Sequence, residues 1–150
     1  WTLGSDKAIY EETYTTPVTL TATPADIMGE EGNAILIPQQ LVKWDPESDP
    51  TNTAKGAYLS IRLQINTVAG AQVYPFPSNA DCTWAAIPID TNWEPGKKYV
   101  YNLDLSKGAG NVDPHDPDPG KPVLGGPIDF TVDVKDWAPQ NQDVPMKPAN

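Results

Sequence analysis

Alternation of apolar and polar side chains near the C-terminus is the feature that most constrains this fold. Residues 127–137 read PIDFTVDVKDW, and every second side chain from Ile128 to Val134 is apolar. A period of two places one set on a buried face of a strand and the other in water. Residues 97–105 (KKYVYNLDL) alternate in the same way, behind a Glu94–Lys97 segment with Pro and Gly where a type II turn needs them. Both segments predict strands and favour an all-β fold.

Further strands are predicted between clusters of turn residues, at 7–14, 17–22, 34–39, 57–66 and 83–89. Within 57–66, Leu59, Ile61, Leu63 and Ile65 are expected to face the core, and Tyr58, Ser60 and Arg62 to face outward. Residues 23–29 predict at most one helical turn, and 43–53 and 113–120 predict loops. About seven strands without long helices predict a two-sheet β-sandwich. We expect one domain over 1–150, with an ordered core at 7–137 and a Pro-rich tail at 138–150.

The charge balance excludes some classes of partner. With 20 acids and 10 bases the net charge is -10, which repels phosphate backbones and anionic lipid. No run approaches the roughly 20 apolar residues of a membrane span. We therefore expect neither nucleic-acid binding nor direct membrane insertion of this domain.

No catalytic set can be assembled from the sequence. His115 is the only histidine and lies in a loop between two Asp-Pro pairs, so we expect a surface residue rather than a base held in place. Cys82 is the only cysteine, which rules out an internal disulfide, and its neighbour Asp81 disfavours a reactive thiolate. We expect Cys82 to be a small, half-buried side chain, and we predict no enzymatic activity and no cofactor.

The acidic loop at 113–120 provides the candidates for a metal site. Asp113, Asp116 and Asp118 offer hard oxygen ligands at close spacing, which calcium requires. Their spacing is not that of an EF-hand, and the intervening prolines oppose wrapping around an ion. We therefore expect a solvated, flexible loop without bound metal.

Aromatic residues keep carbohydrate binding open as an alternative. Trp44, at a loop edge, and Tyr58, with its outward parity, are the candidates for stacking on sugar rings. Trp84, Trp93 and Trp137 are at predicted strand ends, where they are expected to close the ends of a sandwich.

Four blocks of sequence together resemble a known family. They are AILIPQQ (34–40), WAAIPI (84–89), WEPGKKYVYNL (93–103) and PIDFTVDVKDW (127–137). In this order they are similar to the C-terminal half of fimbrillin-like proteins of Bacteroidales bacteria, over roughly residues 10–137. The resemblance implies a transthyretin-like β-sandwich, exported to the outer-membrane surface. It also implies that the chain is the C-terminal part of a longer protein, expected to be a lipoprotein.

The function that this resemblance implies is structural or adhesive and non-catalytic, in a pilus subunit or a pilus-associated protein. The expected partners are other fimbrial subunits or surface proteins, and host or bacterial glycans. Pilus subunits of the family associate by strand exchange, for which the candidate segment contains Ile128, Phe130, Val132 and Val134. The alternative is that 128–137 is simply the last intramolecular strand. The resemblance also implies that a protease cuts pilus subunits of the family after an arginine. Arg62, the only arginine, lies inside a predicted strand, so no such cleavage site is expected here.

Overall fold

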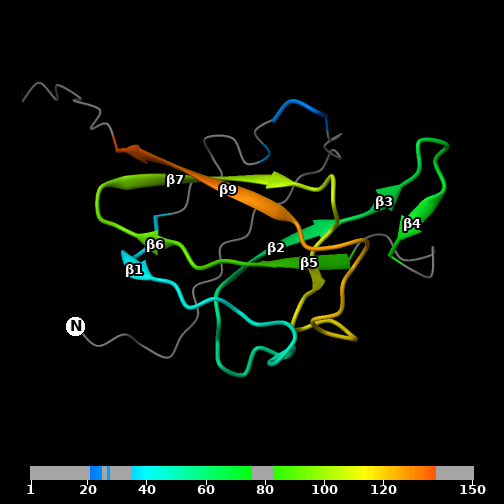
Figure 1. Cartoon of the computed structure of the whole chain (residues 1–150), viewed down its shortest axis with the longest axis horizontal. Helices are drawn as coiled ribbons and strands as arrows, with labels where there is room; N and C mark the ends of the chain where they lie inside the picture. The colour runs from blue at the N-terminus through cyan, green and yellow to red at the C-terminus, as the bar shows by residue number, and fades with distance from the viewer. Residues whose placement is uncertain (1–20, 25–26, 28–34, 76–82, 138–150) are drawn as a thin grey trace, which may run out of the picture. The chain divides into compact units, whose positions relative to one another are not determined.

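The computed structural model describes residues 21–24, 27, 35–75 and 83–137. The chain divides into two compact units, residues 1–37 and 38–150, and every described strand belongs to the second. The strands are β1 (Gln39–Gln40), β2 (Tyr58–Leu63), β3 (Ile65–Asn66), β4 (Gln72–Tyr74), β5 (Thr83–Pro88), β6 (Asn92–Trp93), β7 (Lys97–Asp104), β8 (Asn111–Val112) and β9 (Asp129–Asp136). The described residues form no helix and several small antiparallel sheets (Figure 1), which confirms the all-β prediction.

The largest sheet has three strands in the order β2–β5–β8. β2 and β5 pair antiparallel, from Tyr58 opposite Pro88 to Leu63 opposite Thr83. Ala85, Ala86 and Ile87 are buried in succession, so both faces of β5 are covered. A central strand covered on both faces is apolar throughout instead of alternating. The residues at 83–89 form a short apolar run because β5 is the central strand of this sheet.

The longest ladder joins β7 and β9 antiparallel, from Lys97 opposite Asp136 to Asp104 opposite Asp129. Its register places the alternating apolar residues of both strands on one face, where the rings of Tyr101 and Phe130 lie 6.1 Å apart. The turn before β7 has Gly96 at φ 71°, as a type II turn requires at that position. The strands predicted from the alternation within 97–105 and 127–137 are confirmed as β7 and β9.

Two short pairs, β1–β6 and β3–β4, complete the described pairing. The sequence did not predict β4, because three residues show too little of a period to identify a strand. The turn between β3 and β4 is closed by hydrogen bonds of Thr67 with Gly70 and Ala71, and Gly70 has φ 86°. The predicted strand at 57–66 therefore continues, after a register shift between Ile65 and Asn66, into a hairpin.

Two predicted elements are wrong where the structure describes them. Residues 35–38, expected in a strand, have no regular structure, and Ile35 is 94% exposed. Pairing starts only at Gln39, because a strand needs a neighbour as well as apolar side chains. Of the predicted helical turn, Thr23, Pro24 and Ile27 are described, and none is helical.

Several other predictions fall outside the described residues. These are the strand at 7–14, most of that at 17–22, Cys82 and the tail at 138–150. Thr21 and Ala22, at the end of the second predicted strand, are described and are not in a strand.

Trp44 is the largest side chain of the core that the structure describes, at 1% exposure. Its indole N–H donates to the Asp49 carbonyl at 2.8 Å, and its ring lies 5.4 Å from that of Tyr58. A Cβ on Gly56 would come within 2.5 Å of the Trp44 Cα, so this approach requires glycine. Trp44 is therefore not available as a sugar-stacking candidate, because its ring packs in the core and offers no face to a ligand.

Replacing Trp44 tests its place in the core. We expect Trp44→Ala to lower the free energy of unfolding by about 3–5 kcal/mol, because a large buried ring leaves a cavity. Trp137→Ala is the matched control, since that side chain is 56% exposed, and a change within about 0.5 kcal/mol is expected. Urea denaturation followed by circular dichroism measures both, and equal losses would contradict the burial of Trp44.

The loop around Trp44 is held by the carboxylate of Asp49. It accepts hydrogen bonds from the Ala54 N–H and from the N–H and hydroxyl of Thr53. These donors, with the Ala54 N–H first, lower the pKa of Asp49. A carboxyl whose pKa is lowered by folding stabilises the fold above its unfolded pKa of about 3.9. This contribution is lost as the pH falls through the lower folded pKa.

Asp49→Asn therefore removes a pH-dependent contribution to stability. The variant is expected to be less stable than the wild type at neutral pH and to lose less stability on acidification below about pH 4. Urea midpoints across that range measure the effect. Glu47→Gln, an exposed acid of the same loop, serves as the control, and identical acid profiles for Asp49→Asn and wild type would refute the role of Asp49.

Candidate functional site

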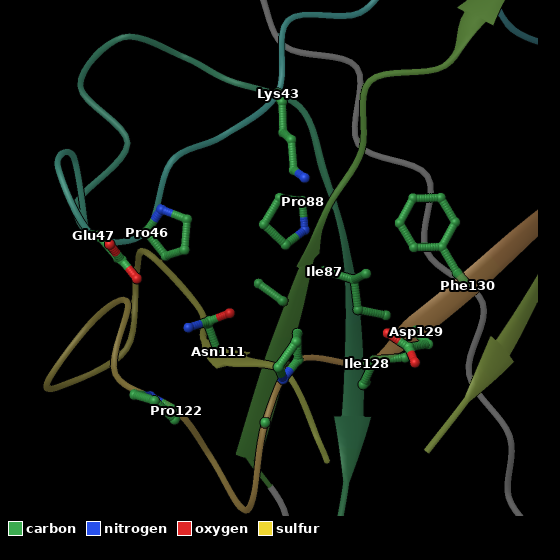
Figure 2. Close-up of a pocket in the computed structure, with 14 residues that line it drawn as sticks. Lys43, Pro46, Glu47, Ile87, Pro88, Asn111, Pro122, Ile128, Asp129 and Phe130 are labelled. Atoms are coloured by element: carbon green, nitrogen blue, oxygen red, sulfur yellow. The ribbon is translucent and has the colours of Figure 1, made fainter. Parts of the chain in front are cut away.

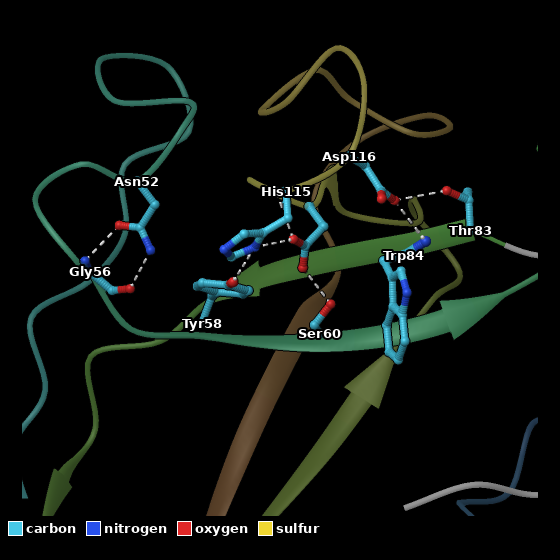
Figure 3. Close-up of polar contacts among 9 residues, drawn as sticks. Asn52, Gly56, Tyr58, Ser60, Thr83, Trp84, His115 and Asp116 are labelled. Atoms are coloured by element: carbon cyan, nitrogen blue, oxygen red, sulfur yellow. Dashed lines mark hydrogen bonds and ion pairs between the residues drawn. The ribbon is translucent and has the colours of Figure 1, made fainter. Parts of the chain in front are cut away.

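A polar cluster joins β2 to the acidic loop and contains Tyr58, Ser60, Asp113 and His115 (Figure 3). The Ser60 hydroxyl donates to Asp113 Oδ2 at 2.6 Å, and the His115 backbone N–H donates to Oδ1 at 2.9 Å. Asp113 is 6% exposed, so its carboxylate depends on these donors for the hydrogen bonds that water would otherwise supply. The loop is tied to β5 as well, by the Asp113 N–H to the Trp84 carbonyl.

The imidazole of His115 lies beside the buried carboxylate. Its Nδ1 is 3.0 Å from Asp113 Oδ1 and 3.3 Å from the Tyr58 hydroxyl. Because an ionised carboxylate only accepts hydrogen bonds, the tautomer that fits this contact has its proton on Nδ1. The side chain is 69% exposed, which confirms the prediction of a surface histidine.

The order of these contacts limits their chemistry. The carboxylate of Asp113 stands between the hydroxyl of Ser60 and the imidazole of His115. In a hydrolytic triad the imidazole stands between the hydroxyl and the carboxylate, where it removes the hydroxyl proton. Ser60 is therefore not set up as a nucleophile by His115, and the group that the imidazole can serve is Asp113.

The three calcium candidates do not converge. Asp116 accepts from the Thr83 hydroxyl at 3.0 Å and from the Trp84 N–H at 3.3 Å, whereas Asp118 pairs with Lys121 at 2.7 Å. Asp113 instead faces Ser60 and His115. Among the described residues no three metal-ligating side chains form a group. The expectation of a solvated loop is also wrong at Asp113, which is buried against the sheet.

An open pocket of about 520 Å³ lies beside the first residues of β9. Apolar lining comes from Ile87 of β5, and from Ile128 and Phe130 (Figure 2). Charged side chains line it as well, and Figure 2 shows Lys43 extending toward Pro88. The pocket can take an apolar side chain or a small ring.

One hydrogen bond shows which backbone groups of β9 face away from β7. The Trp137 N–H donates to the Gly96 carbonyl, on the β7 side, at 2.9 Å. Backbone groups alternate in direction along a strand. The N–H groups of Phe130, Val132 and Val134 therefore point away from β7. Within residues 35–75 and 83–137, β9 pairs with β7 alone.

The four residues of the candidate strand-exchange segment do not all lie on the β9 edge. Phe130, Val132 and Val134 lie in β9, and Val134 is exposed. Ile128 precedes the strand and is buried, with its Cδ1 close to the backbone of Gly110. Ile128 thus anchors the start of β9 in the core and is not available as an edge residue.

The remaining aromatic candidates have mixed surroundings. Tyr58 is half-buried between Trp44 and His115, and burial, followed by the nearby charge of Asp113, raises its pKa. Trp93 is half-buried, and its indole N–H donates to the Tyr101 hydroxyl at 3.0 Å. Trp137 is exposed and closes no sheet end, which corrects that expectation.

Comparison with known proteins supplies no relative: no protein-family model, no curated protein and no solved structure matches the chain. In the part of the chain that the structure describes, no helix has the length and apolar character to cross a membrane.

Removing the Ser60 hydroxyl tests the polar cluster. Ser60→Ala takes a donor from a buried carboxylate, and we expect a loss of about 1–3 kcal/mol in the free energy of unfolding. Ser48→Ala is the matched control, because it removes a hydroxyl donor to Asp45 at an exposed position, where about 0.5 kcal/mol or less is expected. Equal losses in urea denaturation would mean that the Asp113 contact is not buried in solution.

Proposed function

We propose that this chain is a non-catalytic cell-surface domain of fimbrillin-like type, structural or adhesive, in a pilus subunit or a pilus-associated protein. The observation that carries the proposal is the outer edge of β9, an eight-residue strand that has one partner among the described residues. Such an edge is a template for a strand from another chain.

The proposed architecture is a transthyretin-like sandwich with β2–β5–β8 in one layer and β7–β9 in the other. Both sheets have an apolar face, which carries Leu59 opposite Ile87 in one sheet and Tyr101 opposite Val132 in the other. An apolar sheet face must be covered by another layer to be stable. Ile128, directly before β9, is buried with its Cδ1 close to the backbone of Gly110, directly before β8, and this contact supports packing between the two layers.

Strand addition at the β9 edge would use backbone groups for affinity and alternate side chains for register. The pocket beside Asp129 and Phe130 offers a place for an apolar side chain of the added strand. The proposed partners are other subunits or surface proteins, outside the cell at the outer-membrane surface. Sugar binding is not proposed, because burial of Trp44 removes one of its two candidate residues.

A pair of proline variants tests the edge. Val134→Pro deletes an N–H that points away from β7, and an edge strand tolerates proline there. Asp133→Pro deletes an N–H on the β7 side and is expected to break the ladder. The probe is a labelled peptide of residues 127–137, whose binding to the full chain is followed by fluorescence anisotropy.

We expect the peptide to bind the wild type, and Val134→Pro to weaken binding at least about tenfold while keeping the wild-type circular dichroism, since one backbone hydrogen bond and its geometry are lost. Asp133→Pro should lose both binding and structure. Absence of binding to the wild type, or unchanged binding by a folded Val134→Pro, would refute an accessible β9 edge.

A further inference from the structure

We propose that the peptide bond between Asp113 and Pro114 is a site of self-cleavage. The Asp113 carboxylate attacks its own main-chain carbonyl carbon, and His115 supplies the proton that the Pro114 nitrogen needs to leave. This is a single-turnover reaction of the chain on itself. It rests on the polar cluster and is independent of the surface function proposed above.

The nucleophile is held and partly desolvated. The side-chain carboxylate and the main-chain carbonyl of one aspartate can close a five-membered ring, and intramolecular attack has effective molarities up to about 10⁵–10⁸ M when the groups are aligned. Asp113 is buried, and its carboxylate is held by Ser60 and by the His115 N–H. Burial replaces bulk water around the attacking oxygens with a few protein donors.

The Asp113 main-chain carbonyl and the Pro114 nitrogen are also suited to this reaction, as electrophile and leaving group. The Asp116 N–H donates to the Asp113 carbonyl oxygen at 3.0 Å. This donor is aimed at the oxygen where negative charge develops during attack. Pro114 provides a tertiary amide nitrogen without an N–H, which departs as a secondary amine once it is protonated.

The proton donor is the neighbouring imidazole. His115 is two residues from Asp113 in sequence, and its Nδ1 lies at 3.0 Å from the carboxylate. The groups facing it are the Asp113 carboxylate from its own loop and the Tyr58 hydroxyl from β2. An imidazole that carries a second proton can give it up as a general acid. A general acid that reaches the leaving nitrogen accelerates a reaction by about 10²–10⁴-fold.

The step balances without any added reagent other than water. An Asp113 side-chain oxygen bonds to the Asp113 carbonyl carbon, and the bond from that carbon to the Pro114 nitrogen breaks. The nitrogen keeps the electron pair and takes the proton from His115. The products are a cyclic anhydride at Asp113 and a free amine at Pro114. Water then opens the anhydride to two carboxyl groups, and the imidazole regains its proton from solvent.

Four other Asp-Pro bonds in the chain serve as internal controls for cleavage at Asp113–Pro114. They begin at Asp45, Asp49, Asp116 and Asp118. His115 is the only histidine, and the carboxylates of these four residues bind other groups. Asp45 and Asp49 accept from backbone N–H groups of their own loop. The hydrogen bonds of Asp116 go to β5, and Asp118 pairs with Lys121. Cleavage in the folded chain is therefore expected at Asp113–Pro114 in preference to the other four.

Cleavage would divide the chain without separating its parts. The fragment from Pro114 onward contains β9, whose eight residues pair with β7 in the other fragment. The two fragments are expected to remain associated in native solution and to separate only under denaturing conditions.

The test is incubation of the full chain in mildly acidic buffer, followed by intact mass spectrometry. We expect fragments 1–113 and 114–150 to accumulate over days. His115→Ala, at an exposed position, should slow their appearance about 100-fold or more. Pro114→Ala, which makes the scissile bond an ordinary secondary amide, should abolish it. Hydroxylamine in the buffer should trap the anhydride as a hydroxamate at Asp113, which a contaminating protease would not produce.

Denaturant provides the structural control. In guanidinium the imidazole is no longer held beside Asp113, so cleavage in acid should spread over all five Asp-Pro bonds. Circular dichroism of both variants shows whether they fold as the wild type does. An intact wild type, an unchanged rate in a folded His115→Ala, or equal cleavage at the five bonds of the folded chain would each overturn the proposal.

Discussion

The burial of β5 on both faces is the constraint on which the rest of the described structure depends. Ala85, Ala86 and Ile87 exclude water in succession, so both sides of the strand need cover. One side carries the apolar pairs with β2, among them Leu59 opposite Ile87. On the other side, Ser60 lies opposite Ala86 and meets the acidic loop through Asp113. The loop is therefore part of the packed structure.

An acidic loop can pack on a sheet only if its carboxylates find donors. Asp113 takes its donors from Ser60 and His115, and Asp116 takes them from Thr83 and Trp84. The same contacts direct the carboxylates away from a common centre. They also place the Asp113 carboxylate beside the His115 imidazole, next to the Asp113–Pro114 bond. The packing of the loop and the proposed self-cleavage thus depend on the same hydrogen bonds.

The alternation of apolar and polar residues was sufficient to predict the strands that have one face in water. The period of two predicted β7 and β9 nearly to their ends, and it predicted the half-buried positions of Leu59 and Ile61 in β2. It failed for β4 and β8, whose two or three residues are held by hydrogen bonds to neighbours. It also misread 35–38, where apolar residues have no strand to pair with among the described residues.

The sequence by itself determined the all-β character and the apolar face of each long strand, because side-chain direction follows from local backbone geometry. Only the tertiary structure decided that Trp44 is buried, that Asp113 is buried against the sheet, and that His115 touches its carboxylate. Those facts depend on contacts between segments far apart in the chain, such as Ser60 with Asp113. A local pattern contains no information about which distant segment will cover a given residue.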